Sequence, residues 1–386
     1  MDFKYLGEEH LTGFEKYKYN CKDTSPLSNY IMHPFWNKVI LICPKWIAPN
    51  LLTFLGFLFT VATFLLLSYY DYEFYASAMQ SVVAPIPQWV FILSAINIFI
   101  AYTLDGIDGK QARRTGTSGP IGELFDHGLD SFTASLIPII MYHVFGRHES
   151  TSLTTWRLYL ILWNVLINFH LTHWEKYNTG LLFLPWGYDF SMWCAVFVFL
   201  VGGIWGHEAW HFTLPGNISS GGMFELMLYI SSAITNVPVV FYNVYASYRD
   251  KTGYMRSFSE SFRPFVSIIL FFVMTTLWVI KRPGILEDDP NALFILIGTI
   301  FSNICCRLIV AQMSSTRCEL YNWLLYPTGI CIFASVMTQY TQVDIALLYS
   351  LLLLALLAHI HYGTCVVREM CDHFHINCFK IRQHAD

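Results

Sequence analysis

Residues 105–130 read DGIDGKQARRTGTSGPIGELFDHGLD, and this stretch places five acidic residues between two long apolar runs. Only 13% of the 386-residue chain is Asp, Glu, Lys or Arg, so the stretch gathers charge in a chain that otherwise avoids it. Carboxylates beside a membrane-spanning segment are costly, and they usually mark a functional site. We therefore expect the functional site of the protein in this stretch. The apolar runs on either side of it indicate the fold class.

The apolar flanks belong to a chain in which 55% of residues are hydrophobic. Several windows approach the roughly 20 apolar residues that cross a bilayer as one helix. We predict an all-α integral membrane protein with about ten transmembrane helices. The predicted spans are 47–69, 88–107, 129–146, 154–173, 189–206, 224–247, 264–281, 291–311, 321–340 and 343–362.

Three regions follow from these spans: a cytoplasmic or interfacial segment (1–46), a polytopic catalytic domain (47–363) and a cytoplasmic tail (364–386). In the first region, Ser25 and Pro26 predict the start of an amphipathic helix that lies on the bilayer surface. An ordinary helix packed on the domain is the alternative. The net charge of −4 gives no basic surface for nucleic acid, and the scattered cysteines form no disulfide framework.

Lys and Arg concentrate in the loops at 105–128 and 248–263 and in the C-terminal tail. By the positive-inside rule these segments are cytoplasmic, which places the acidic stretch on the cytoplasmic side. An even number of spans then puts both termini in the cytoplasm.

The loops at 70–87 and 207–222 contain no Lys or Arg, so we expect them on the lumenal side. The second loop carries the glycosylation sequon Asn217-Ile218-Ser219, which agrees with that side. Lys281 and Arg282 also fall on the predicted lumenal side and count against this orientation.

The acidic residues follow a helical spacing on both sides of a short polar loop. One stripe has the positions i, i+3, i+4 and i+7, and the second stripe repeats that spacing after Gly119-Pro120, a pair that suits a helix start. We expect the two stripes to face each other across neighbouring helices. The stripes are Asp105, Asp108, Gly109 and Ala112, and Glu123, Asp126, His127 and Asp130.

Three basic residues, Lys110, Arg113 and Arg114, cannot balance five acids. Two Mg²⁺ ions would bring four positive charges and accept the oxygen ligands that Asp offers, and Mn²⁺ has similar preferences. The small residues beside the acids leave room for a ligand to approach the backbone, and the nearby cations suit an anionic group. The pattern therefore predicts a phosphate-transfer site; its small residues are Gly106, Gly109, Ala112 and Gly122.

The full pattern resembles the signature of the CDP-alcohol phosphotransferase family. The matching positions read Asp105-x2-Asp108-Gly109-x2-Ala112-Arg113-x8-Gly122-x3-Asp126-x3-Asp130. The stretches GKQARRT, GELFDHGLD, HWEKYNTGLLFLPWGYD, QMSSTRC and AHIHYG resemble the eukaryotic choline and ethanolamine branch of that family, over most of the chain. HWEKYNTG and LPWGYD look most like its ethanolamine-using members.

The resemblance implies transfer of phosphoethanolamine from CDP-ethanolamine to diacylglycerol, with phosphatidylethanolamine and CMP as products. A cholinephosphotransferase or a dual-specificity enzyme is the alternative. The resemblance also implies a membrane enzyme of the endoplasmic reticulum or Golgi, surrounded by membrane lipids and expected to form a homodimer.

The family pattern assigns the residues as follows. Asp105, Asp108, Asp126 and Asp130 would hold the two Mg²⁺ ions, with Asp130 nearest the incoming hydroxyl. The four small residues would line the CDP pocket, Lys110 and Arg113 would contact phosphate, and Asn50 would contact cytosine or phosphate.

The general base is open between two residues. Glu123 and His127 stand at i and i+4, so the carboxylate could orient the imidazole as a base for the lipid hydroxyl. Asp130 is the second candidate. His127 could instead form a hydrogen bond to a metal-ligating carboxylate, as is common around metal sites.

Two other motifs allow two interpretations each. Trp174, Glu175 and Tyr177 in HWEKYNTG (173–180) could receive an ammonium group, or they could belong to an interfacial aromatic belt. CDHFHINC (371–378) offers zinc ligands, but its compact spacing favours a packed tail. A cation-coupled transporter and a non-catalytic scaffold are the rival classes. The chain has no internal repeat of the transporter kind, and its motif is intact.

Overall fold

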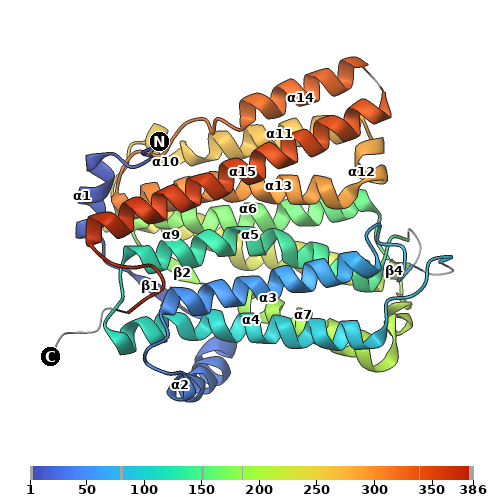
Figure 1. The fold of residues 1–386 in the computed structure, drawn as a ribbon, viewed down its shortest axis with the longest axis horizontal. Helices are drawn as coiled ribbons and strands as arrows, with labels where there is room; N and C mark the ends of the chain where they lie inside the picture. The colour runs from blue at the N-terminus through green and yellow to red at the C-terminus, as the bar shows by residue number, and fades with distance from the viewer. Residues whose placement is uncertain (1–2, 79–80, 149–151, 185, 339, 382–386) are drawn as a thin grey trace.

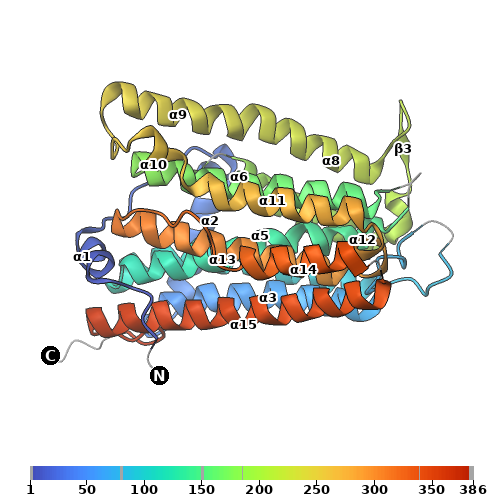
Figure 2. The ribbon, with the colours of Figure 1, turned by 90° about the horizontal axis from the view of Figure 1, so that it is seen from above.

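The computed structural model describes residues 3–78, 81–148, 152–184, 186–338 and 340–381. These residues form a bundle of long helices that run side by side along one axis (Figure 1), and the view from above shows the same arrangement (Figure 2). The strands in the described chain make two small sheets: β1 (Cys21–Asp23) pairs in parallel with β2 (Leu182–Leu184), and β3 (Thr213–Leu214) pairs antiparallel with β4 (Ile218–Ser219). The prediction of an all-α architecture is confirmed.

Each predicted span coincides with a helix or a run of consecutive helices. Within the described chain, eight such segments are long and apolar enough to cross a membrane. The other two predicted spans are α6, which is more polar, and α14, which is shorter. The helices are α3 (Pro49–Tyr70), α4 (Gln88–Thr115), α5 (Pro120–Phe145), α6 (Thr155–Thr179), α7 (Gly187–Trp205), α8 (Ser220–Ser231) continued by η3 (Ser232–Asn236) and α9 (Val237–Asp250), α10 (Phe258–Phe262) with α11 (Pro264–Lys281), α13 (Pro290–Ser314), α14 (Leu325–Thr338) and α15 (Thr341–Phe374).

Proline and glycine set the ends of the helices that carry the acidic residues. Helix α4 ends at Thr115 and is followed by Gly116, whose φ of 68° is the left-handed conformation that glycine adopts readily. Helix α5 begins at Pro120, as predicted, because proline at the first helical position needs no hydrogen-bond acceptor for its nitrogen. Both acidic stripes are therefore helical, and only a short turn separates them.

Helix α5 is held closely against α13, the most deeply buried of the candidate spans. A Cβ atom on Gly298 of α13 would lie 2.2 Å from Ser135 Oγ of α5, so only glycine allows this approach. Nearby, the hydroxyls of Ser131 and Ser302 form a hydrogen bond between the same two helices. Small residues of this kind bring membrane helices into close contact. The packing fixes the position of α5, which carries Asp126.

The N-terminal region contains α1 (Glu8–Lys16) and the predicted amphipathic helix, formed by a π-helical turn, η1 (Ser28–Met32), and α2 (His33–Ile42). Ser25 Oγ accepts a hydrogen bond from Ser28 N at 3.2 Å, so Ser25 caps this helix. Trp36 is buried against α4, whereas Leu41 and Ile42 are exposed. Exposed apolar side chains fit a helix at a bilayer surface, and that placement stays a prediction.

The two ends of the bundle differ. The described chain begins and ends at the end of the bundle that holds α1 and β1 (Figure 1), whereas η2 (His207–Trp210), β3, β4 and α12 (Gly284–Asp288) lie at the other. Arg282, which seemed misplaced by its charge, donates from Nε to Asp344 Oδ2 at 2.7 Å. The side chain of Asp344 is 4% exposed, so Arg282 serves as the partner of a buried carboxylate. The ion pair with Asp344 therefore explains why Arg282 occurs at the end of the bundle that was predicted to be lumenal.

Candidate active site

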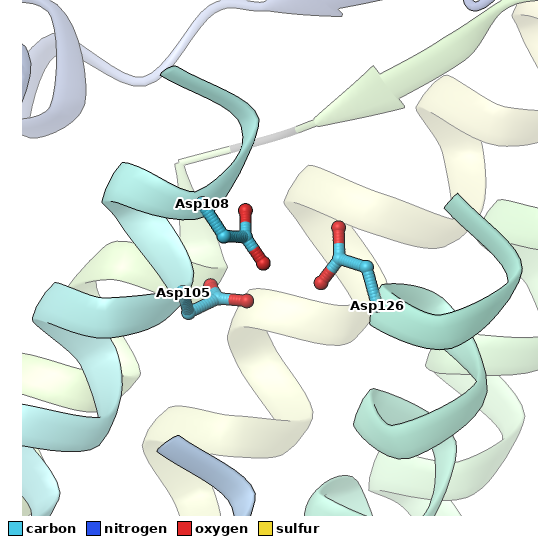
Figure 3. Close-up of side chains that lie close together, drawn as sticks. All are labelled: Asp105, Asp108 and Asp126. Carbon is cyan, nitrogen blue, oxygen red and sulfur yellow. The ribbon is translucent and has the colours of Figure 1, made fainter. Parts of the chain in front are cut away.

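Three aspartates meet across the gap between α4 and α5. Asp105 and Asp108 project from α4 toward Asp126 on α5 (Figure 3). One oxygen from each lies within 4.8 Å of the others, which is close enough for all three to hold one metal ion. Unbalanced carboxylates at this spacing repel one another, so the arrangement favours a bound cation. Asp130 lines the same cavity but lies outside this group of three.

Hydrogen bonds from two neighbouring helices hold the α4 carboxylates in place. The hydroxyl of Thr53 on α3 donates to Asp108, and the hydroxyl of Tyr188 on α7 donates to Asp105 Oδ2 at 2.9 Å. Such donors fix the orientation of metal-ligating groups. Neither residue was predicted from the sequence. Tyr188 belongs to the quoted stretch LPWGYD, but nothing in its spacing links it to Asp105.

The acidic cluster stands in a cavity of about 1370 Å³. Its polar part lies between the acidic ends of α4 and α5 and the terminal segments of the chain. From there the cavity continues along α5, α6 and α8, where much of its lining is apolar. This inner lining includes Ile137, Met141, Leu158, Ile161, Val165 and Leu228.

Glu123 makes contacts that sequence reasoning did not foresee. Its carboxylate accepts hydrogen bonds from Lys176 Nζ on α6 and from the Tyr17 hydroxyl just after α1. Burial, and then the adjacent Glu123 carboxylate, raises the pKa of Tyr17 above its ordinary value, so the phenol remains a donor. Lys176 neutralises Glu123, and Tyr17 ties the N-terminal segment to the wall of the cavity.

His127 lies between two carboxylates without a hydrogen bond to either. Its Nδ1 is 3.7 Å from Glu123 Oε1, and its Nε2 is 3.6 Å from Asp126 Oδ2. Within the described residues, Nδ1 is buried and has no hydrogen-bond partner. The imidazole is thus beside the acidic cluster, while Glu123 is already engaged by two other donors.

The predicted small residues have different surroundings. A Cβ atom on Gly109 would lie 3.5 Å from Arg113 Nη1, and one on Gly122 would lie 3.7 Å from Asn50 Oδ1, both ordinary contacts. A Cβ atom on Gly106 would lie 2.1 Å from the Trp36 ring. Gly106 therefore has a packing reason to be glycine, because α2 rests on α4 at this point.

The remaining predicted ligand residues line the cavity mouth. Ala112 and Arg113 come from the last turns of α4, and Asn50 comes from the first turn of α3. Lys110 also lines the cavity, and its Nζ donates to Asn37 Oδ1 of α2 at 2.9 Å.

The aromatic residues of HWEKYNTG pack inside the protein. Trp174 Nε1 donates to Ser261 O at 2.6 Å, and its ring contacts Phe265. The Arg256 guanidinium lies 3.8 Å from the centre of the Tyr177 ring. Neither aromatic residue is part of the cavity lining, so the geometry favours internal packing over ammonium binding.

Known proteins are similar to this chain over almost its whole length. Residues 46–214, which include both acidic helices, match the family described as CDP-alcohol phosphatidyltransferase. Human ethanolaminephosphotransferase 1 is 46% identical over 382 residues, covering 99% of this chain and 96% of the human protein. The chain therefore belongs to the CDP-alcohol phosphotransferase family and is a transferase.

Two further relatives place the chain within the family. Mouse ethanolaminephosphotransferase 1 is 46% identical over 99% of this chain and 96% of its own length. Choline/ethanolaminephosphotransferase 1 of Arabidopsis thaliana is 28% identical over 98% of both chains. The proteins named for ethanolamine alone are thus the more similar of these relatives.

Gly106→Ala should lower the free energy of unfolding by about 1–3 kcal/mol, because the new methyl group overpacks the contact with Trp36. Adding Trp36→Leu should recover part of that loss. The matched control is Gly109→Ala, which has space for a methyl group. Denaturant unfolding in detergent measures all three variants, and an unchanged stability of Gly106→Ala would contradict the packing role.

Proposed function

We propose that this protein transfers phosphoethanolamine from CDP-ethanolamine to diacylglycerol and releases phosphatidylethanolamine and CMP. The observation that carries the proposal is the acidic cluster of Asp105, Asp108 and Asp126 at the polar end of a cavity with an apolar interior. The similarity to ethanolaminephosphotransferase 1 over almost the whole of both chains supports ethanolamine as the head group.

The metal site is proposed on the chemistry of its donors. The family depends on divalent metal ions, and the three clustered aspartates offer the hard oxygen ligands that such ions prefer. We propose two Mg²⁺ ions, with Mn²⁺ as a substitute, and Asp130 as the fourth ligand residue. When bound, divalent ions neutralise a pyrophosphate and stabilise the leaving oxygen.

The nucleotide would occupy the mouth of the cavity between α3, α4 and α5. Gly109, Ala112 and Gly122 leave space there, Arg113 supplies positive charge, and Asn50 supplies an amide. Lys110 reaches the phosphate only if it leaves its hydrogen bond with Asn37. Gly106 serves this pocket indirectly, because it lets α2 pack on α4.

The acceptor lipid would place its acyl chains along the apolar lining of α5, α6 and α8. The hydroxyl of the lipid would then reach the acidic cluster from the apolar interior of the cavity, on the side opposite the departing CMP. His127 is the preferred base, because its unpaired Nδ1 and its Nε2 both lie within 4 Å of a carboxylate. Asp130 remains the second candidate.

The polar mouth of the cavity is proposed to face the cytoplasm, with both termini on that side, in the endoplasmic reticulum or Golgi. The concentration of Lys and Arg in loops at this end supports that orientation. Homodimerisation stays a prediction from the family resemblance.

Purified protein in lipid nanodiscs with diacylglycerol should use CDP-ethanolamine in preference to CDP-choline when both are supplied, and a chelator should abolish transfer. Asp108→Asn should lower kcat/KM by about 100-fold or more, because it removes a charge that holds metal. Asp372→Asn changes an exposed acid on α15 and is the matched control. Preference for CDP-choline, or turnover that survives chelation, would refute the proposal.

His127→Ala should lower kcat by about 100- to 10,000-fold if the imidazole accepts the hydroxyl proton. The KM for CDP-ethanolamine should change little, since the nucleotide pocket is formed by other residues. Steady-state kinetics with saturating diacylglycerol measure both constants. Near-normal turnover would remove His127 from this role and leave Asp130 as the base.

Asn217 is exposed on the β3–β4 hairpin, at the end of the bundle opposite the acidic cluster. If that end is lumenal, expression with microsomes should add one glycan that endoglycosidase removes. Asn217→Gln should abolish the shift in mobility. Absence of a glycan on an accessible Asn217 would argue for the reverse orientation.

A further inference from the structure

The described residues that follow the last helix stay in contact with the bundle. Helix α15 ends at Phe374; the next residue, His375, has a φ of 51°, and the residues after it turn back toward the cavity. We call residues 376–381 the C-terminal strap. A tight turn shapes it: Asn377 and Lys380 form an antiparallel bridge, and Phe379 N donates to Asn377 Oδ1 at 3.1 Å.

The strap is anchored to the helices that form the mouth of the cavity. Asn50 Nδ2 at the start of α3 donates to Cys378 O at 3.0 Å. The Phe379 ring lies 6.0 Å from the Phe54 ring and 5.5 Å from the Phe125 ring, measured between ring centres. These contacts reach α3 and α5, so the strap bridges two walls of the mouth.

The anchor point is close to the acidic cluster. Asn50 lies one helical turn before Thr53, whose hydroxyl binds Asp108. The Oδ1 atom of the same Asn50 faces Gly122, where an added Cβ atom would make an ordinary contact at 3.7 Å. Asn377, Cys378 and Lys380 of the strap all line the cavity that contains the cluster. The strap is thus the outer boundary of the space proposed for the nucleotide.

The charges around this space show what the strap contributes. Three Lys or Arg residues line the cavity, and one of them, Lys110, is bound to Asn37. Across the part of the chain that the structure describes, the side chains of Arg113 and Lys380 form no hydrogen bond and no ion pair, although the Arg113 guanidinium is near enough to Asp108 to attract its carboxylate. Burial raises the pKa of Cys378 to about 11, so its thiol adds no negative charge beside them.

We propose that the C-terminal strap forms the outer wall of the nucleotide pocket and that Lys380 binds a phosphate of the CDP-alcohol. A pyrophosphate carries two negative charges, and Arg113 and Lys380 are the two cavity-lining cations whose side chains form no hydrogen bond or ion pair within the described residues. The lysine is exposed and flexible, which suits a group that binds an entering anion and releases CMP. This inference rests on the proposed function, because it takes a nucleoside diphosphate as the ligand.

Equilibrium binding of cytidine, CMP and CDP to the full chain tests the inference without requiring turnover. Lys380→Ala should weaken CDP binding about fivefold and leave cytidine binding unchanged, since only the phosphates meet the lysine. Lys380→Arg should restore affinity. Lys18→Ala removes an exposed lysine outside the cavity and should have no effect.

Kinetics give a second measure. Lys380→Ala should raise the KM for CDP-ethanolamine by a similar factor while kcat and the KM for diacylglycerol stay the same. Phe379→Ala, which loosens the strap but keeps the lysine, should shift the same KM in the same direction.

The outcomes separate the two proposals. A wild-type protein that binds no cytidine nucleotide and transfers nothing would refute the proposed function. A wild-type protein that turns over while Lys380→Ala binds CDP normally would overturn the inference alone. Equal losses for cytidine and CDP would also overturn it, because they would show a change of pocket shape and not the loss of a phosphate contact.

Discussion

The mutual repulsion of the aspartates between α4 and α5 is the constraint on which the rest of the structure depends. Asp105, Asp108 and Asp126 can remain ionised this close together only if cations balance them and their helices cannot move apart. The fold meets the second condition with contacts from outside the pair. Thr53 of α3 and Tyr188 of α7 hold the carboxylates, and the Gly298–Ser135 contact locks α5 against α13.

The features that could be predicted from the sequence are those that depend on residue spacing within a single helix. Hydrophobic runs located the spans, and Gly119-Pro120 located the start of α5, because both signals are local. The i, i+3 pattern correctly placed Asp105, Asp108 and Asp126 face to face. The match between the chain and its family pattern then indicated a reaction class that the geometry alone would leave open.

Contacts between distant segments could not be predicted in this way. Tyr17 and Lys176 reach Glu123 from positions 106 and 53 residues away, and the strap reaches Asn50 across 328 residues. The periodicity of residues within one helix carries no information about contacts between segments so far apart in the sequence. Gly106 is a second example of a contact that the sequence did not predict. Its place in the motif predicted room for a ligand, but the Trp36 ring fills the space beside it. A glycine in a ligand motif can thus owe its identity to helix packing.

The cavity also explains why α6 has no window apolar enough to count among the candidate membrane spans. A spanning helix that faces lipid must be apolar, but α6 turns Asn164, Asn168 and His173 toward the cavity and is shielded from lipid by its neighbours. The same helix supplies Lys176, which neutralises the buried Glu123 beside the acidic cluster. Low hydropathy in α6 therefore reflects its position in the bundle: its polar side chains line the space where a water-soluble nucleotide and a membrane lipid must meet.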